Sequence, residues 1–237
     1  MDFAIGFDFD HTLGVDNRLE RSVMLAQLHE IAAVAGVVVD LAAAEIAVET
    51  TLHAYRHGFV GVEDGVGSFF TEFVPGHATE TLDAAALFRE RVVAEAPAKI
   101  EPIAGALDML SALDGLGVRY ALLTNGWSPL QETKARLLKW QGGVFVSERI
   151  GARKPTREAF DVLADHLELP LAQIWYVGDD PETDCGGALA AGMTSVWFDW
   201  EGRAYPSELP RPTHTIHALS ELVPLVQGQM AETTKRA

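Results

Sequence analysis

Short apolar runs that end in polar residues alternate with helical patterns along most of the chain. Residues 3–7 form an uninterrupted apolar run, which is typical of a strand buried on both faces of a parallel sheet. Four further strands are predicted within "VRYALLTNG", "GVFVSERIG", "IWYVGDD" and "TSVWFDW", and helical patterns separate them. A short edge strand and a closing helix are predicted at 213–226, followed by a frayed tail at 228–237. This alternation predicts an α/β core with a Rossmann-like, doubly wound parallel sheet.

A long helical stretch interrupts the alternation after the first strand. From residue 17 to about residue 98 the apolar positions follow a helical period, with amphipathic stretches near 42–57, 66–73 and 82–94. Two prolines then flank a short link before the strands resume. We therefore expect two domains, which are a core of residues 1–15 and 100–237 and an inserted all-helical domain of residues 16–99.

Composition and charge restrict the class of protein. The 237 residues are 48% hydrophobic and 22% charged, as in soluble globular proteins, and the net charge of −16 opposes binding to nucleic acid or anionic lipid. No segment reaches the roughly 18 consecutive apolar residues of a membrane span, and the first residues lack the basic region of a signal peptide. A single cysteine, Cys185, cannot form an intramolecular disulfide. We expect a cytoplasmic protein with no nucleic-acid or membrane partner, and the oligomeric state stays open.

Polar residues follow four of the predicted strands. In open α/β sheets ligands bind beyond the carboxyl ends of the strands, so these residues are the candidates for chemistry. One such aspartate alone is commonly a turn former or a helix cap, but polar residues at four strand ends indicate a site. The candidates, in chain order, are Asp8 and Asp10, Thr124 and Asn125, Lys154, and Asp179, Asp180 and Asp184.

The acidic residues among these candidates predict a cation. Carboxylates that crowd together at the edge of a core are unfavourable unless a positive charge joins them, and Lys154 alone is too little. One or two carboxylates, with water and phosphate oxygens, are the usual ligands of Mg²⁺. A site rich in histidine or cysteine is absent from these segments, which argues against zinc. Mg²⁺ is therefore the expected cofactor.

Four segments of the chain carry a resemblance to a known family. The segments "DFDHTL", "LLTNG", "GARKP" and "VGDDPETD" stand in the order and character of the four motifs of the haloacid dehalogenase-like hydrolase superfamily, which the chain resembles from about residue 3 to residue 226. The resemblance implies a Rossmann-like core, a mobile cap inserted after the first motif, and Mg²⁺-dependent phosphatase activity. The helical insertion at 16–99 stands at the position of that cap, where we expect it to act as a lid.

The resemblance also implies a role for each candidate residue. Asp8 would be the nucleophile that becomes an aspartyl phosphate, and Asp10 would be the general acid and base. Thr124 and the backbone N–H of Asn125 would bind phosphate oxygens, and Lys154 would offset their charge and that of Asp8. The metal ligands would be the Asp8 carboxylate, the Asp10 backbone carbonyl and Asp179, with Asp184 orienting Lys154 or a metal-bound water.

The leading hypothesis is a Mg²⁺-dependent phosphomonoester hydrolase that acts on a small phosphorylated metabolite. Dehalogenases of the family generally lack the second acid of the first motif, so Asp10 argues against dehalogenation. Two alternatives stay open, which are a phosphosugar mutase of the same family and a non-catalytic binding protein that keeps the fold. The sequence does not identify the substrate.

Three further features have two interpretations each. His11 stands where many relatives have glycine, and a structural role is favoured over proton transfer. Asp180 either supports the metal or caps the following helix, and the cap is favoured. In the insertion, the segment "HAYRHGFVGVEDG" with Arg56 is the best candidate for substrate recognition, although basic residues at a helix C-terminus also stabilise the helix dipole.

Overall fold

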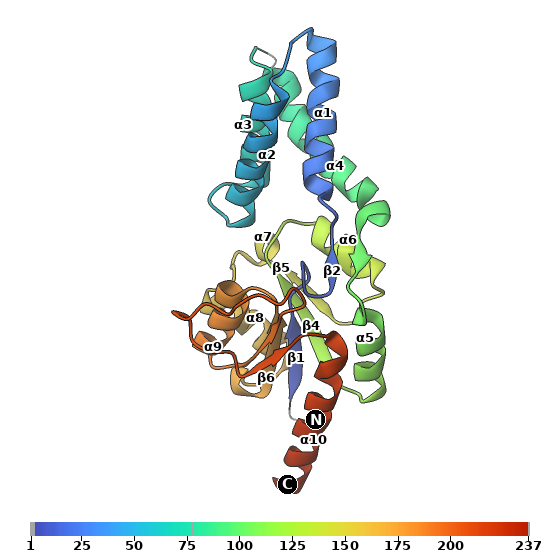
Figure 1. Cartoon of the computed structure of the whole chain (residues 1–237), viewed down its shortest axis with the longest axis vertical. Helices are drawn as coiled ribbons and strands as arrows, with labels where there is room; N and C mark the ends of the chain where they lie inside the picture. Colours follow the sequence, from blue (N-terminus) through green and yellow to red (C-terminus); the bar gives the residue numbers. More distant parts are fainter. Residues whose placement is uncertain (1–2, 77, 237) are drawn as a thin grey trace. The chain divides into compact units, whose positions relative to one another are not determined.

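The computed structural model describes residues 3–76 and 78–236, which divide into two compact units (Figure 1). The first unit consists of Met1–Val15 and Glu101–Ala237, and the second is Asp16–Ile100. The sequence analysis divides the chain after residues 15 and 99. The function of the second unit as a cap stays a prediction.

A six-stranded parallel sheet forms the centre of the first unit, which confirms the predicted doubly wound α/β fold. The strand order is β5-β4-β1-β6-β7-β8, and every neighbouring pair is parallel. The strands are β1 (Ala4–Phe7), β4 (Arg119–Thr124), β5 (Gly143–Val146), β6 (Ile174–Gly178), β7 (Thr194–Phe198) and β8 (His214–Ile216). Two short strands, β2 (Gly14–Val15) and β3 (Glu101–Pro102), form a separate antiparallel pair.

The central strand β1 explains why polar residues gather at one edge of the sheet. All four residues of β1 are buried, as expected for an apolar strand with neighbours on both sides. Phe7 lies opposite Leu122 of β4 and Val177 of β6, and the Asp8 amide donates to the Val177 carbonyl at 2.9 Å. The carboxyl ends of β4, β1 and β6 are therefore adjacent, so the residues that follow them share one edge.

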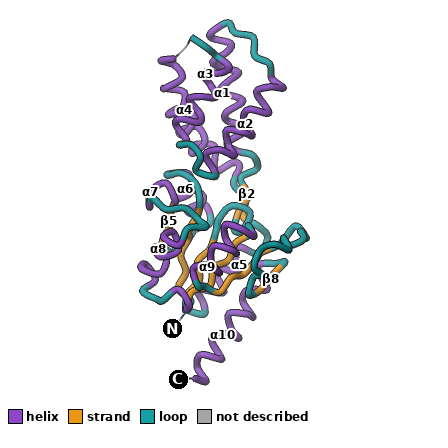
Figure 2. The backbone as a smooth tube through the Cα atoms, turned by 90° about the vertical axis from the view of Figure 1, so that its left-hand side faces the viewer, coloured by secondary structure: helices purple, strands orange, loops and turns teal. Residues whose placement is uncertain are grey.

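Helices cover both faces of this sheet. In Figure 1, α8 and α9 lie on one side and α5 and α10 on the other, and Figure 2 shows the strands in orange among these helices. Phe160 and Leu163 of α8 pack on Tyr176 of β6 in one apolar cluster. The helices are α5 (Ala106–Gly115), α6 (Leu130–Leu137), α7 (Ser147–Ile150), α8 (Arg157–Leu167), α9 (Gly187–Ala191) and α10 (Leu222–Arg236), with a π-helical turn η2 at Pro181–Gly186 and 3₁₀ turns at Leu171–Gln173 and Leu219–Glu221.

For two segments of this unit, the sequence predicts the wrong end of a strand or helix. The strand predicted in "GVFVSERIG" ends at Val146, and Ser147–Ile150 is a helical turn. The strand stops there because the Ser147 hydroxyl lies against the neighbouring loop and accepts from the Gly126 amide at 3.0 Å. The tail predicted to be frayed is helical through Arg236. Residues such as Gln, Met, Ala and Glu in that tail favour a helix, and the buried Val226 anchors it.

The second unit consists of four helices. They are α1 (Leu19–Ala35), α2 (Leu41–Arg56), α3 (Val62–Phe73) and α4 (Ala78–Lys99), and within the described residues of this unit no strand interrupts them. Consecutive helices pack on one another, and α4 also packs on α1, where Gln27 donates to the Ala84 carbonyl at 2.7 Å. None of the helices in the described part of the chain is long and apolar enough to cross a membrane.

Candidate active site

Lys154 lies at the centre of a buried cluster at the carboxyl edge of the sheet. Its ammonium group donates to Asp8 Oδ1 at 2.7 Å, to Asp184 Oδ1 at 2.7 Å and to the Tyr176 hydroxyl at 2.8 Å. The Tyr176 hydroxyl in turn donates to the Leu123 carbonyl at 2.6 Å, which fixes the ring. Asp8 and Asp184 are 146 and 30 residues away from Lys154 in the sequence, and the fold brings both carboxylates to the same ammonium group.

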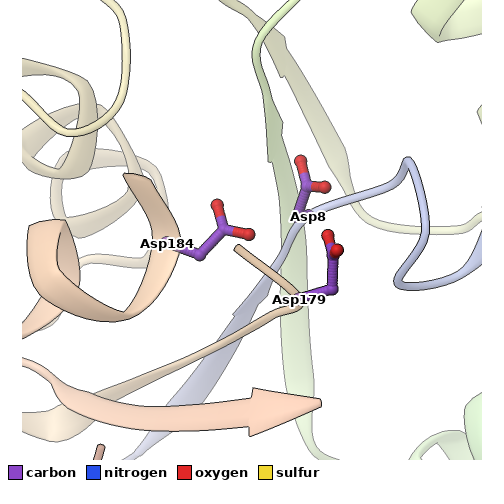
Figure 3. Close-up of side chains that lie close together, drawn as sticks. All are labelled: Asp8, Asp179 and Asp184. Atoms are coloured by element: carbon purple, nitrogen blue, oxygen red, sulfur yellow. The ribbon is translucent and has the colours of Figure 1, made fainter. Parts of the chain in front are cut away.

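Three carboxylates converge beside this lysine. Figure 3 shows Asp8 from the end of β1, Asp179 from the end of β6 and Asp184 from η2 directed toward one another. One oxygen from each lies within 4.8 Å of the others, a spacing at which they could hold a metal ion. The predicted grouping of Asp8 with Asp179 is thus present in the geometry.

The electrostatics of the cluster show an excess of negative charge. Burial, together with neighbouring carboxylates, raises the pKa of Asp8 and of Asp179 to about 7, although Lys154 lowers the pKa of Asp8 and Arg203 that of Asp179. Burial likewise raises the pKa of Asp184 to about 6. Burial opposes the charge of Lys154, but Asp184 and Asp8 raise its pKa well above the usual range. Lys154 and Arg203, whose guanidinium lies 3.3 Å from Asp179 Oδ2, bring two positive charges to three carboxylates. An additional cation would therefore stabilise the ionised cluster.

Asp184 is placed to orient Lys154. Its Oδ1 accepts from Lys154, and its Oδ2 accepts from the Asp180 amide at 3.0 Å. Hydrogen bonds at both oxygens fix this carboxylate beside Lys154, as the expected supporting role requires. A Cβ on Gly178 would lie 2.3 Å from Asp184 Oδ2, so only glycine at this strand end lets the carboxylate approach so closely.

Thr124 and Asn125 lie at the end of β4, beside the cluster. The buried Thr124 hydroxyl makes no hydrogen bond to any residue that the structure describes, which is unusual for a buried polar atom. The Asn125 side chain accepts from the Lys154 amide at 3.0 Å and donates to the Lys154 carbonyl at 2.9 Å. Asn125 therefore connects the two loops, a function of its side chain that the sequence does not reveal.

Asp10 has two neighbours that the sequence analysis missed. Lys134 Nζ lies 2.6 Å from Asp10 Oδ1, and Gln131 Nε2 lies 3.0 Å from Asp10 Oδ2. Both neighbours belong to α6 and are buried. Helical spacing could have indicated that Lys134 is buried, because it is four residues after the apolar Leu130 and therefore lies on the same face of the helix.

Arg203, in the loop after β7, is a further neighbour that the sequence analysis did not select. Its guanidinium donates to the Asp179 carbonyl at 2.9 Å and lies 3.3 Å from Asp179 Oδ2. Trp197 Nε1 also donates to the Asp179 carbonyl at 2.9 Å. These contacts fix the backbone and side chain of Asp179 at the strand end.

The structure distinguishes between the interpretations of His11 and Asp180. His11 is exposed, has a φ of 60° and donates its backbone N–H to the Gly14 carbonyl at 2.9 Å. A positive φ explains why glycine suits this turn and supports a structural role for the position. The Asp180 side chain accepts from the amides of Glu182 and Thr183, which confirms the predicted cap.

The second unit has its own buried charged group, and Arg56 belongs to it. Glu20 is buried, and its two oxygens accept from the Tyr55 hydroxyl and from the Arg56 guanidinium, each at 2.6 Å. Arg56 Nη2 also lies 3.4 Å from Asp16 Oδ2. These contacts within the unit favour a structural role for Arg56 over recognition of a substrate.

Comparison with known proteins assigns the family. The model of the haloacid dehalogenase-like hydrolases matches residues 4–192, most of the chain, and the chain belongs to this family of hydrolases. Among curated proteins, the pyrimidine 5'-nucleotidase YjjG of Escherichia coli is 30% identical over 129 residues, which are 53% of this chain and 56% of that protein. The matches span about half the length, or less, of the first curated relatives.

Two solved structures show the same fold. The HAD-hydrolase YfnB of Bacillus subtilis, bound to magnesium, superposes with a TM-score of 0.69 at 22% identity, over 96% of this chain and all of that chain. A 2-haloacid dehalogenase from Pseudomonas syringae has a TM-score of 0.73 at 22% identity, over 97% of this chain and 100% of that chain. At this level of identity the likeness concerns the fold, and it does not separate phosphatases from dehalogenases.

Proposed function

We propose that the chain is a Mg²⁺-dependent phosphomonoester hydrolase that acts on a small phosphorylated metabolite. The observation that carries this proposal is the pair of acids, Asp8 and Asp10, at the end of β1, each hydrogen-bonded to its own lysine. Transfer of a phosphoryl group to water needs both a nucleophile and a proton carrier, and this pair supplies one of each.

Asp8 and Asp10 divide the reaction into two steps. In the first, an Asp8 oxygen attacks phosphorus, the bond to the leaving oxygen breaks, and Asp10 gives that oxygen a proton. In the second, Asp10 takes a proton from water, the water oxygen attacks the aspartyl phosphate, and the electron pair of the breaking bond returns to Asp8. The Thr124 hydroxyl, which is buried beside them, and the Asn125 backbone N–H would bind phosphate oxygens, and the charge of Lys154 would offset the charge of the phosphate.

The donor set of the cluster fits Mg²⁺. Asp8 and Asp179 provide hard carboxylate oxygens within 4.8 Å of one another, and the Asp10 backbone carbonyl would be a third ligand. When bound, Mg²⁺ supplies positive charge that offsets the charge of the transferring phosphoryl group. Arg203 and Trp197 hold Asp179 for this purpose through its carbonyl.

The test is phosphate release from a panel of phosphorylated nucleotides, sugars and carboxylic acids, with Mg²⁺ and with excess chelator. Nucleoside monophosphates are included because the relative YjjG is named a pyrimidine 5'-nucleotidase. Release that requires Mg²⁺ and disappears in Asp8→Asn supports the proposal. Accumulation of an isomeric sugar phosphate would identify a mutase, and Mg²⁺ binding without any turnover would identify a binding protein. Full activity in chelator contradicts the Mg²⁺ dependence.

A further inference from the structure

A lysine and a glutamine on α6 hold the two oxygens of Asp10. Lys134 Nζ lies 2.6 Å from Oδ1 and Gln131 Nε2 lies 3.0 Å from Oδ2, so each oxygen has its own donor. The two residues are three positions apart, which places them on the same face of the helix. A carboxylate held at both oxygens from one rigid element has a single orientation.

The burial of these two polar side chains is costly unless polar contacts such as those with Asp10 offset it. Lys134 is only 1% exposed, and a lysine is almost never so buried unless it is paired. Gln131 is 3% exposed, and its buried Oε1 makes no hydrogen bond to any residue within the described ranges. Replacing a buried ion pair with apolar residues is often neutral or stabilising, so stability alone does not account for these residue types.

The loop after β4 is shaped around the same glutamine. A Cβ on Gly126 would lie 2.6 Å from Gln131 Nε2 and 2.9 Å from its Cγ, so any larger residue would displace the side chain from Asp10. Gly126 directly follows Thr124 and Asn125, the predicted phosphate-binding residues. The orientation of Asp10 is thus linked to the loop that would bind the phosphate.

We propose that Lys134 and Gln131 are positioning residues, which hold the Asp10 carboxylate in the orientation from which it exchanges protons with the leaving oxygen and with water. This inference rests on the proposed phosphatase function and assigns it two residues beyond the family motifs. Both act through Asp10 and neither touches the phosphoryl group. Misplacing a catalytic group by about 1 Å can lower a rate about 100-fold, which sets the size of the expected effect.

The test compares two classes of phosphomonoester. p-Nitrophenyl phosphate has a leaving group that needs no proton, whereas an alkyl phosphate needs the proton from Asp10. We expect Lys134→Met to lower kcat/KM about 10- to 100-fold for the alkyl ester and much less for the aryl ester. Gln131→Met, which keeps the length of the side chain, should show the same selectivity with a smaller loss. It provides the same readout should Lys134→Met not fold.

A double-mutant cycle separates positioning from a general loss of structure. In the Asp10→Asn background, Lys134→Met should have no further effect on the alkyl ester, because the group it positions is already gone. Lys139→Met, the same change at an exposed residue just after α6, is the matched control and should keep the wild-type rate. Equal losses for both esters, or additive losses in the cycle, would overturn the inference and leave the phosphatase function standing. Absence of phosphate release by the wild-type protein would overturn both.

Discussion

The two units each contain a buried charged group, and the two groups differ in how their charges balance. In the helical unit, the buried carboxylate of Glu20 accepts from Arg56 and from the Tyr55 hydroxyl, and Asp16, the other carboxylate near Arg56, is partly exposed to solvent. At the edge of the sheet, three carboxylates converge beside two cations, Lys154 and Arg203, and the pKa values of Asp8 and Asp179 are raised to about 7. Removing one partner from a balanced group is destabilising, whereas an excess of buried negative charge is unfavourable until a cation joins it.

This contrast is consistent with the assignment of the chemistry to the first unit. Buried polar atoms without a partner are rare, yet the hydroxyl of Thr124 bonds to none of the residues that the structure describes, and it lies beside the unbalanced cluster. In contrast, both oxygens of Glu20 are satisfied. Substitutions in the two groups should therefore separate catalytic from structural effects.

The largest effect is expected from Asp8→Asn. The amide is nearly isosteric but a poor nucleophile, so phosphate release should fall to the detection limit. The thermal midpoint without metal should stay at or above that of the wild type, because an amide removes one of the crowded negative charges. Phosphate release at the wild-type kcat would contradict the assignment of the nucleophile.

Lys154→Ala should have the next largest effect. The change leaves Asp8 and Asp184 buried without their common cation, and we expect a loss of about 10²- to 10³-fold in kcat together with destabilisation by about 3–5 kcal/mol. Lys154→Arg should rescue poorly, because the planar guanidinium does not replace a compact ammonium with three partners. Steady-state kinetics and denaturant unfolding measure the two losses, and equal activity of all three proteins would place Lys154 outside the site.

Removing the metal should give the unbalanced cluster a pH dependence. An aspartate of pKa about 7 in the folded chain has a pKa near 4 when unfolded, so Asp8 and Asp179 favour folding below pH 4 and lose that contribution as pH rises to 7. In chelator the thermal midpoint should therefore decline between pH 5.5 and pH 8, relative to Asp8→Asn. Mg²⁺ should raise the midpoint more at pH 8 than at pH 5.5, and an equal rise at both would contradict this reasoning.

The comparison also shows which parts of the site could be predicted from the sequence. Asp8 follows an apolar run directly, so the buried strand and its carboxylate are both visible in the pattern. The partners of Asp10 are not visible in the pattern, because helical spacing puts Lys134 on the buried face of α6 but does not tell which group it contacts. That depends on the turn at 11–14 and on the way α6 packs, which are tertiary features.

The residues at which strands and helices end also depend on tertiary contacts that the sequence pattern does not show. Val144 and Val146 favour a strand, but the length of β5 is set by its neighbour β4, with which residues 143–146 pair. The contact of Ser147 with the loop at Gly126 then ends the strand. Local propensity predicts the existence of such elements, and tertiary contacts determine where they stop.

The smallest effect on catalysis is expected from Arg56→Ala. Arg56 donates to Glu20 through Nε at 3.2 Å and through Nη2 at 2.6 Å, so its loss leaves a buried carboxylate with the Tyr55 hydroxyl as its remaining donor among these contacts. We expect destabilisation by about 1–3 kcal/mol, measured by denaturant unfolding, because a buried acceptor loses its charged partner.

The kinetics of Arg56→Ala decide whether Arg56 has a structural role or recognises the substrate. If Arg56 is structural, kcat/KM should be unchanged for p-nitrophenyl phosphate and for the best substrate of the panel alike. Tyr55→Phe is the matched control, since it removes the other hydrogen bond to Glu20 and should also lower stability without changing either rate. A fall in kcat/KM confined to the best substrate, seen in Arg56→Ala and not in Tyr55→Phe, would instead make Arg56 a recognition residue. The balanced group would then have a second function in addition to stabilising the helical unit.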